Sequence, residues 1–103
     1  MSKFKVVKPF FKTHKKNGHP SYIYAENSEE YKYIGITHSS KTHCLKNKRL
    51  KYNPNPLDSR SSYIRSFSTR DKKDNFRMNI KKGYKIHKAD KKMIRQVKRN
   101  HRY

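Results

Sequence analysis

The sequence contains few acidic residues. Seven Asp and Glu stand against 28 Lys and Arg in 103 residues, which gives a formal net charge of +21 at pH 7. Self-repulsion of this size opposes a compact state, so the charge implies a polyanionic partner that neutralises it. Nucleic acid is the partner that we expect, and we place RNA first, although charge alone does not distinguish RNA from DNA.

Cysteine and long apolar runs are scarce as well. The single cysteine, Cys44, cannot form an intramolecular disulfide, and no set of Cys and His has zinc-finger spacing. We therefore expect a reducing, cytoplasmic location and no structural zinc. No run approaches the roughly 20 apolar residues of a membrane span, and residues 3–9 are too short and too charged for a signal peptide. We expect no membrane partner.

Aromatic residues indicate that the chain folds despite its low apolar content. Only 31% of the residues are hydrophobic, but eight are Tyr and five are Phe, which disordered tails usually lack. The length suits one domain with one modest core. We expect a single basic α+β domain over residues 1–99 and a flexible tail over residues 100–103.

Four short runs of aromatic and β-branched residues predict strands, at residues 4–7, 22–25, 31–37 and 63–67. Pro9 is expected to end the first strand, and the acidic turn at residues 26–30 predicts a hairpin between the second and third. Alternation along the fourth strand places Tyr63, Arg65 and Phe67 on one face.

Apolar residues near the end of the chain recur at three- and four-residue steps, which predicts an amphipathic helix over residues 88–99. Asp90 stands in its first turn, where a negative charge suits the helix dipole. These elements predict a strongly curved antiparallel sheet or a small SH3-like barrel that the helix closes.

Between these elements, residues 38–60 show no apolar periodicity and predict a long loop. Its basic residues are candidates for nucleic-acid binding: Lys41, Lys46, Lys48, Arg49 and Lys51. Lysine and arginine neutralise phosphates, while neighbouring aromatic rings stack on bases, and this combination binds single-stranded RNA. The alternatives are a solvated or disordered loop and a run that resembles a nuclear-localisation signal.

A second set of candidates suits RNA cleavage. His19 begins one strand and Thr37 to Ser39 end its predicted hairpin partner, so they should lie at the same edge of the sheet. With a cation such as Arg65, they would supply an acid, a base and positive charge at a phosphate. The alternative is a solvated histidine at a turn and hydroxyl groups that satisfy local backbone groups.

The acidic turn offers no convincing metal site. Glu26, Glu29 and Glu30 are close in sequence, but no third type of ligand follows at a recognisable spacing. Consecutive glutamates in an exposed turn usually form a solubilising tip, so we expect no metal and no other cofactor.

The order of these features resembles the PemK/MazF family of toxin endoribonucleases. In that family a turn carries a basic residue and a proline into a hydrophobic strand, as Gly18, His19 and Pro20 do here. Residues 34–39, Ile-Gly-Ile-Thr-His-Ser, are similar to a family strand that ends in a Thr-Ser pair. Residues 75–90 are similar to the family's approach to its final helix.

The resemblance implies an SH3-like barrel with helices, a homodimer and an acidic antitoxin segment that covers the groove. It places His19 where the family usually has a catalytic arginine, and Thr37 where it has a hydroxyl group at the scissile phosphate. Two departures are that a titratable histidine replaces a permanent cation and that His38 separates Thr37 from Ser39.

We therefore expect a metal-independent endoribonuclease that cleaves single-stranded RNA through attack of the 2′-hydroxyl group. His19, Thr37, Ser39 and Arg65 are its candidate catalytic residues. The alternative is a non-catalytic, basic nucleic-acid-binding protein, either phage-encoded or ribosome-associated.

Overall fold

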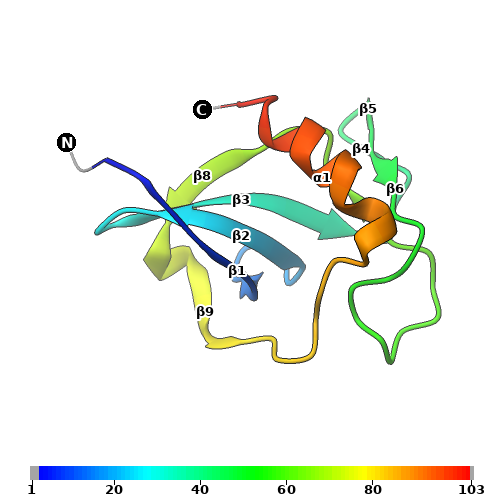
Figure 1. The fold of residues 1–103 in the computed structure, drawn as a ribbon, viewed down its shortest axis with the longest axis horizontal. Helices are drawn as coiled ribbons and strands as arrows, with labels where there is room; N and C mark the ends of the chain where they lie inside the picture. The colour runs from blue at the N-terminus through cyan, green and yellow to red at the C-terminus, as the bar shows by residue number, and fades with distance from the viewer. Residues whose placement is uncertain (1–2, 103) are drawn as a thin grey trace.

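A computed structural model describes residues 3–102 as an α+β fold, which consists of a curved antiparallel sheet and one short helix near the carboxyl end (Figure 1). The α+β class predicted from the sequence is confirmed. Within the described residues, no helix is both long and apolar enough to cross a membrane.

The centre of the sheet is a meander of β1 (Lys5–His14), β2 (Pro20–Glu26) and β3 (Glu30–Thr37). The predicted hairpin between β2 and β3 is confirmed, and the side chain of Asn27 caps its turn by accepting from the backbone N–H groups of Glu29 and Glu30.

The prediction that Pro9 ends the first strand is wrong. β1 continues past Pro9 to His14, and its register with β2 shifts between Val6 and Phe10. Proline cannot donate to a ladder, but an irregularity of this kind removes the need for its N–H group. The residues before and after Pro9 therefore belong to one strand, with an irregularity at the proline.

The outer edge of β3 is shared by two strands. Its first half pairs with β8 (Thr69–Lys72) and its end pairs with β7 (Tyr63–Ile64), which in turn pairs with β6 (Lys48–Arg49). The opposite edge of the meander, on β1, pairs with β9 (Phe76–Ile80).

The sheet bends strongly but does not close. The 3-10 turn η1 (Lys73–Asn75) carries the chain from β8 to β9, and so from one edge of the meander to the other. No strand pairing within residues 3–102 joins β8 to β9. The predicted curved antiparallel sheet is present, whereas an SH3-like barrel is not confirmed.

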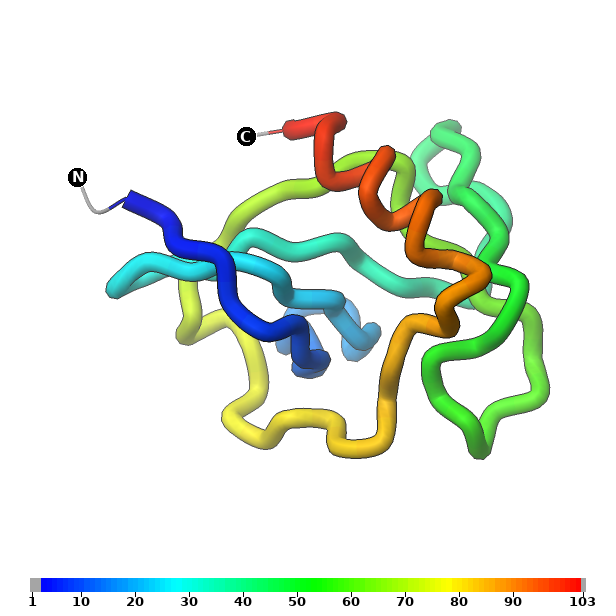
Figure 2. Tube along the Cα trace, viewed as in Figure 1, coloured from blue at the N-terminus to red at the C-terminus, as the bar shows by residue number. Residues whose placement is uncertain are grey.

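Successive side chains of β2 point to opposite faces of the sheet and pack into two separate hydrophobic clusters. Tyr22 and Tyr24 belong to the larger cluster, which also holds Ile94 and Val97 of the helix α1 (Lys91–Lys98). Ile23 points the other way and packs in a smaller cluster. Figure 2 shows how the segment between β9 and α1 passes around the sheet before the helix crosses it.

The predicted helix over residues 88–99 is present as two pieces. A 3-10 turn, η2 (Lys88–Asp90), leads directly into α1. Asp90 is buried between them, and its carboxylate accepts from the backbone N–H of Lys51 at 2.8 Å and of Tyr52 at 3.2 Å. Asp90 therefore anchors the loop to the helix.

The long loop predicted over residues 38–60 contains ordered elements. β4 (Lys41–Thr42) and β5 (Leu45–Lys46) form a small hairpin, β6 joins the sheet, and Leu50 is buried in the larger core. Strands of two residues are too short to produce a readable alternation, which is why the sequence pattern did not reveal them.

The tail predicted to be flexible over residues 100–103 makes backbone contacts in its described part. The backbone N–H of Ser68 donates to the carbonyl of Asn100 at 2.8 Å, and the N–H of Arg102 donates to the carbonyl of Ser68 at 2.9 Å. Residues 100–102 therefore lie beside the segment that leads into β8. Tyr103 lies outside the described residues.

Removal of the Asp90 carboxylate should destabilise the fold. We expect Asp90→Ala to lower the free energy of unfolding by about 2 kcal/mol, since two hydrogen bonds to a charged acceptor are lost. Urea denaturation measures this change. Asp74→Ala is the matched control, because it makes the same change in charge at an exposed position. Equal losses in the two variants would show that Asp90 acts only through net charge.

Candidate functional site

A cavity of about 330 Å³ lies beside the smaller core, against which its lining residue Tyr33 packs. It is lined by residues from the β1–β2 turn, the end of β3, the β4–β5 hairpin and the segment that follows β7. Its polar lining residues include three of the four predicted catalytic residues, His19, Thr37 and Arg65.

The cavity exists because side chains on this face become smaller towards one end. Ile23 and Tyr31 fill the smaller core, and Tyr33 packs against it. Two residues along each strand, Ser21 and Gly35 stand opposite each other and leave space. Alternation places them on the same face as the residues that fill the core.

The side chain of Arg65 passes close to Gly35, and both residues line the cavity. Its backbone N–H donates to the carbonyl of Gly35 at 3.0 Å, and its Cγ would lie 3.2 Å from a Cβ added at position 35. A side chain at position 35 would therefore crowd the stem of Arg65. The glycine allows the arginine to lie against the strand.

The guanidinium of Arg65 lacks a counter-charge. Its Nε is buried and finds no hydrogen-bond acceptor among residues 3–102, and its Cζ lies 4.7 Å from the ring centroid of Phe67. Burial lowers the pKa of Arg65, the phenol of Tyr33 opposes this shift, and the cation of Arg102 adds to it. An anion in the cavity would supply a counter-charge to this guanidinium.

His19 reaches the cavity from the turn before β2 and Thr37 from the end of β3, at the same edge of the sheet as the hairpin geometry predicted. The turn before β2 is fixed by Gly18 at φ +71° and by the His19 N–H, which donates to Asn17 Oδ1 at 2.8 Å. His19 is exposed at the rim, whereas Thr37 is buried.

Ser39 is not among the residues that line the cavity. It is exposed, and its backbone N–H donates to Thr37 Oγ1 at 3.2 Å. Ser39 therefore positions the hydroxyl group of Thr37 through its backbone. The prediction that the Ser39 side chain contacts the phosphate stays a prediction, and in the structure it is the backbone N–H of Ser39 that contacts Thr37.

His43 is a lining residue that the sequence analysis missed. It forms the tip of the β4–β5 hairpin with Cys44, and both residues have positive φ angles, +49° and +66°. Two-residue hairpin turns of this kind usually contain Asn or Gly, so His-Cys is a weak sequence signal. The structure brings His43 and His19, 24 residues apart in sequence, to one cavity.

A buried histidine supports the wall that carries Tyr33. Nδ1 of His14 accepts from the backbone N–H of Lys16 at 3.2 Å, so Nε2 carries a proton and donates to Asp71 Oδ2 at 2.8 Å. Tyr33 stacks on this imidazole with a centroid distance of 5.8 Å. Burial and the Asp71 charge raise the pKa of Tyr33 to about 12, against the effect of Arg65.

The five basic loop residues do not form one cluster. Lys41 and Lys46 are direct partners in the β4–β5 ladder, whose turn contributes His43 to the cavity. Like charges in opposed positions repel, and a bound anion would relieve the repulsion. Of the five predicted basic residues, Lys41 and Lys46 are therefore the two nearest in sequence to residues that line the cavity.

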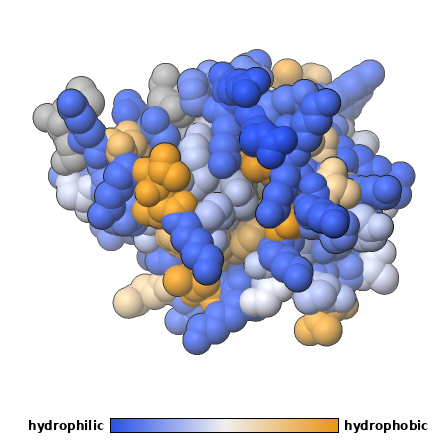
Figure 3. All heavy atoms as spheres, in the orientation of Figure 1, coloured by the Kyte–Doolittle hydropathy of each residue, from blue (hydrophilic) through white to orange (hydrophobic). Residues whose placement is uncertain are grey.

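The other three residues lie beside the helix. Lys48 and Arg49 form β6, and Arg49 and Lys51 border a shallow depression together with Ala89 and Met93. All five predicted loop residues are exposed. Figure 3 shows hydrophilic side chains over most of the face that includes α1, interrupted by smaller apolar patches.

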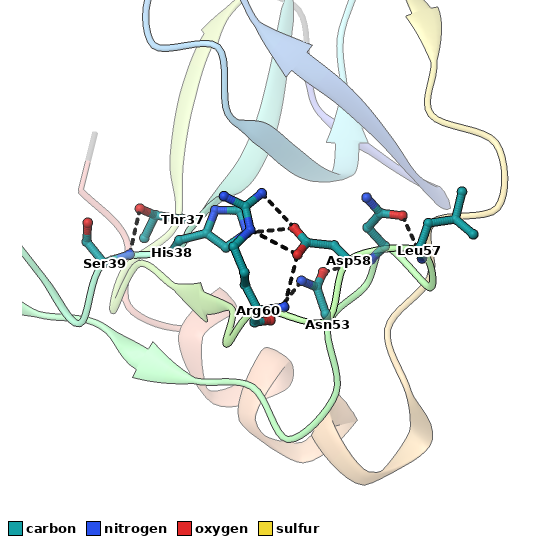
Figure 4. A network of polar contacts seen from close by, with 8 residues as sticks. Thr37, His38, Ser39, Asn53, Leu57, Asp58 and Arg60 are labelled. Atoms are coloured by element: carbon teal, nitrogen blue, oxygen red, sulfur yellow. Dashed lines mark hydrogen bonds and ion pairs between the residues drawn. The ribbon is translucent and has the colours of Figure 1, made fainter.

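His38, which separates Thr37 from Ser39, points away from the cavity. Its Nε2 lies 2.9 Å from Asp58 Oδ2, and Arg60 donates to both oxygens of the same carboxylate at 3.0 Å (Figure 4). Hydrogen bonds from Arg60, and then from His38, hold the pKa of Asp58 well below its usual range. This network closes the proline-containing part of the loop.

Acidic side chains are absent from the cavity lining within residues 3–102. In the predicted acidic turn, Glu26 pairs with Lys73 at 3.3 Å and Glu30 lies 4.0 Å from Arg70. The described part of the chain also contains no group of three His, Cys, Asp or Glu that could hold a metal ion. The cavity is therefore suited to an anion.

Comparison of the chain with protein-family models, with curated proteins and with solved structures finds no significant match in any of the three. Geometry and charge therefore carry the functional conclusion.

The His14–Asp71 contact should make stability depend on acid pH. Burial tends to raise the pKa of Asp71, but hydrogen bonds from His14, Asn75 and the Lys72 N–H outweigh it and leave the pKa below its ordinary 3.8. Asp71 therefore contributes stability above pH 3.8, and this contribution is lost as the pH falls through its lower, folded-state value.

We expect Asp71→Asn to be less stable than the parent at pH 6 and to lose less stability between pH 5 and pH 2. Urea denaturation across that range tests this. Asp74→Asn is the control and should keep the parental pH dependence. A parallel decrease in the parent and Asp71→Asn would contradict the assignment.

Proposed function

We propose that the protein is a metal-independent endoribonuclease that binds single-stranded RNA on its basic surface and cleaves it in the cavity. The observation that carries this proposal is the guanidinium of Arg65, which lies without an acceptor for its buried Nε in a cavity rimmed by His19 and His43. These are the groups that phosphodiester cleavage by a 2′-hydroxyl requires.

The chemistry needs two proton transfers and stabilisation of charge. One of the two histidines removes the proton of the ribose 2′-hydroxyl, and the 2′-oxygen attacks phosphorus. The other donates a proton to the 5′-oxygen, whose bond to phosphorus breaks. Arg65 and the hydroxyl group of Thr37 stabilise the negative charge on the phosphoryl oxygens. The products are a 2′,3′-cyclic phosphate and a 5′-hydroxyl end.

The resemblance to the PemK/MazF family supports the same proposal. His19 and Thr37, the two positions that carry over from that family, line one cavity. Within this proposal the protein is a cytoplasmic toxin, its sheet is a distorted relative of an SH3-like barrel, and an acidic antitoxin segment and a homodimer are its partners. The positive charge is consistent with an acidic regulator.

A non-catalytic nucleic-acid-binding protein is the second candidate. It is favoured by the two rim histidines, because no hydrogen bond orients either ring within residues 3–102, whereas catalytic histidines are usually oriented by a partner. In that case phosphate neutralisation carries the function, and Lys48 and Arg49 would matter more than His19.

Product analysis separates the two candidates. A labelled single-stranded RNA is incubated in chelator with the parent and with His19→Ala, His43→Ala and Arg65→Gln. We expect the parent to leave 2′,3′-cyclic or 3′-phosphate ends, and each histidine variant to lower the rate by about 10²- to 10⁴-fold, because general acid–base catalysis contributes that much.

His87→Asn is the matched control, since His87 lies outside the cavity lining and asparagine retains the ability to cap η2. It should cleave at the parental rate. Ends with a 3′-hydroxyl, or cleavage that requires a divalent ion, would overturn the nuclease proposal. Intact RNA that every variant binds would establish the second candidate.

A further inference from the structure

The carboxyl end of the chain brings a second arginine to Phe67 at the cavity wall. The Cζ of Arg102 lies 5.2 Å from the centroid of the Phe67 ring, and the Cζ of Arg65 lies 4.7 Å from the same centroid. Guanidinium groups are attracted to aromatic faces. One ring therefore holds two cations from segments that are far apart in sequence.

The backbone of Arg102 is fixed on both sides. Its N–H donates to the carbonyl of Ser68 at 2.9 Å, and its carbonyl accepts from the hydroxyl group of Thr69 at 3.1 Å. Ser68 is fully buried, and its hydroxyl group forms a short hydrogen bond with that of Tyr24. The attachment point of Arg102 is therefore part of the core.

Arg65 and Arg102 take part in no ion pair within residues 3–102, although Arg60 and Arg70 do have acidic partners. The two cations also repel each other, since Arg102 contributes to the lowered pKa of Arg65. Two guanidinium groups against one ring, without an ion-pair partner among residues 3–102, carry the charge and the donors that bind a phosphate.

We propose that Arg102 and Arg65 form a second phosphate subsite, which binds the phosphodiester group next to the scissile one. The ligand is a chain phosphodiester of the RNA, so this inference rests on the proposed function. Phe67 keeps the two guanidinium groups in position. Arg102 binds substrate and takes no part in proton transfer.

Salt dependence of binding tests the subsite without cleavage. The probe is a single-stranded 2′-O-methyl RNA, which lacks the attacking hydroxyl group. The affinity of the parent, Arg102→Gln and Arg77→Gln is measured between low and moderate salt. Arg77 is exposed on β9, at the opposite edge of the sheet, so its substitution makes the same change in charge away from the cavity.

We expect Arg102→Gln to reduce the slope of log affinity against log salt by about 0.7, the contribution of one neutralised phosphate on a single strand. Arg77→Gln should keep the parental slope. Arg102→Lys should restore the slope but not the full affinity, because lysine keeps the charge and lacks the planar fork. Thermal unfolding verifies that each variant is folded.

Equal slopes for Arg102→Gln and Arg77→Gln would overturn the subsite, whether or not the protein cleaves RNA. A reduced slope in a protein that never cleaves RNA would remove the nuclease and leave a phosphate subsite for nucleic-acid binding. Inorganic phosphate at matched ionic strength should not displace the oligonucleotide. Displacement that Arg102→Gln abolishes would assign the subsite to free phosphate and overturn the proposal.

Discussion

A few acidic side chains, placed at loops and strand ends, hold segments of this basic molecule together. Only seven are present, and five of them make contacts that hold segments together: Glu26, Glu30, Asp58, Asp71 and Asp90. In a chain with a net charge of +21, each such carboxylate relieves local repulsion and satisfies donors that would otherwise lack an acceptor. None of these five lines the cavity within residues 3–102, and neither do the two exposed acids, Glu29 and Asp74. The basic character of the site therefore follows from where the chain places its few acids.

The cavity follows from the sizes of the side chains that lie on one face of β2 and β3. Large residues fill the smaller core, and the pair Ser21 and Gly35 leaves the end of that face open. Arg65 occupies part of the space, with a buried Nε that has no acceptor. A buried donor without a partner generally costs about 1–3 kcal/mol, and a catalytic or ligand-binding role is one explanation for such a group.

Strong periodicity made some elements predictable. The hairpin of residues 22–37 and the helix before residue 99 were evident from alternation and from three- and four-residue steps, and the meeting of His19 with Thr37 followed from the hairpin. β9 was not evident because only Phe76 among its residues is buried, so no alternation marks it. His43 and Arg102 were missed for a different reason. His43 reaches the cavity, and Arg102 reaches Phe67, through backbone pairing of short segments, and such pairing leaves no pattern in side-chain polarity.

In the proposed function, the anion site of the free protein combines several like charges. Arg65 and Arg102 lie against one aromatic ring without an ion-pair partner among residues 3–102, and Lys41 opposes Lys46 in the hairpin next to His43. Under the same proposal, a phosphate chain that reaches these groups reduces repulsion between like charges as well as adding hydrogen bonds. Binding to the native state alone also stabilises that state by mass action. The five acids stabilise loops and strand ends, whereas Arg65 and Arg102 have no ion-pair partner among residues 3–102. The same uneven distribution of charge therefore accounts for both features.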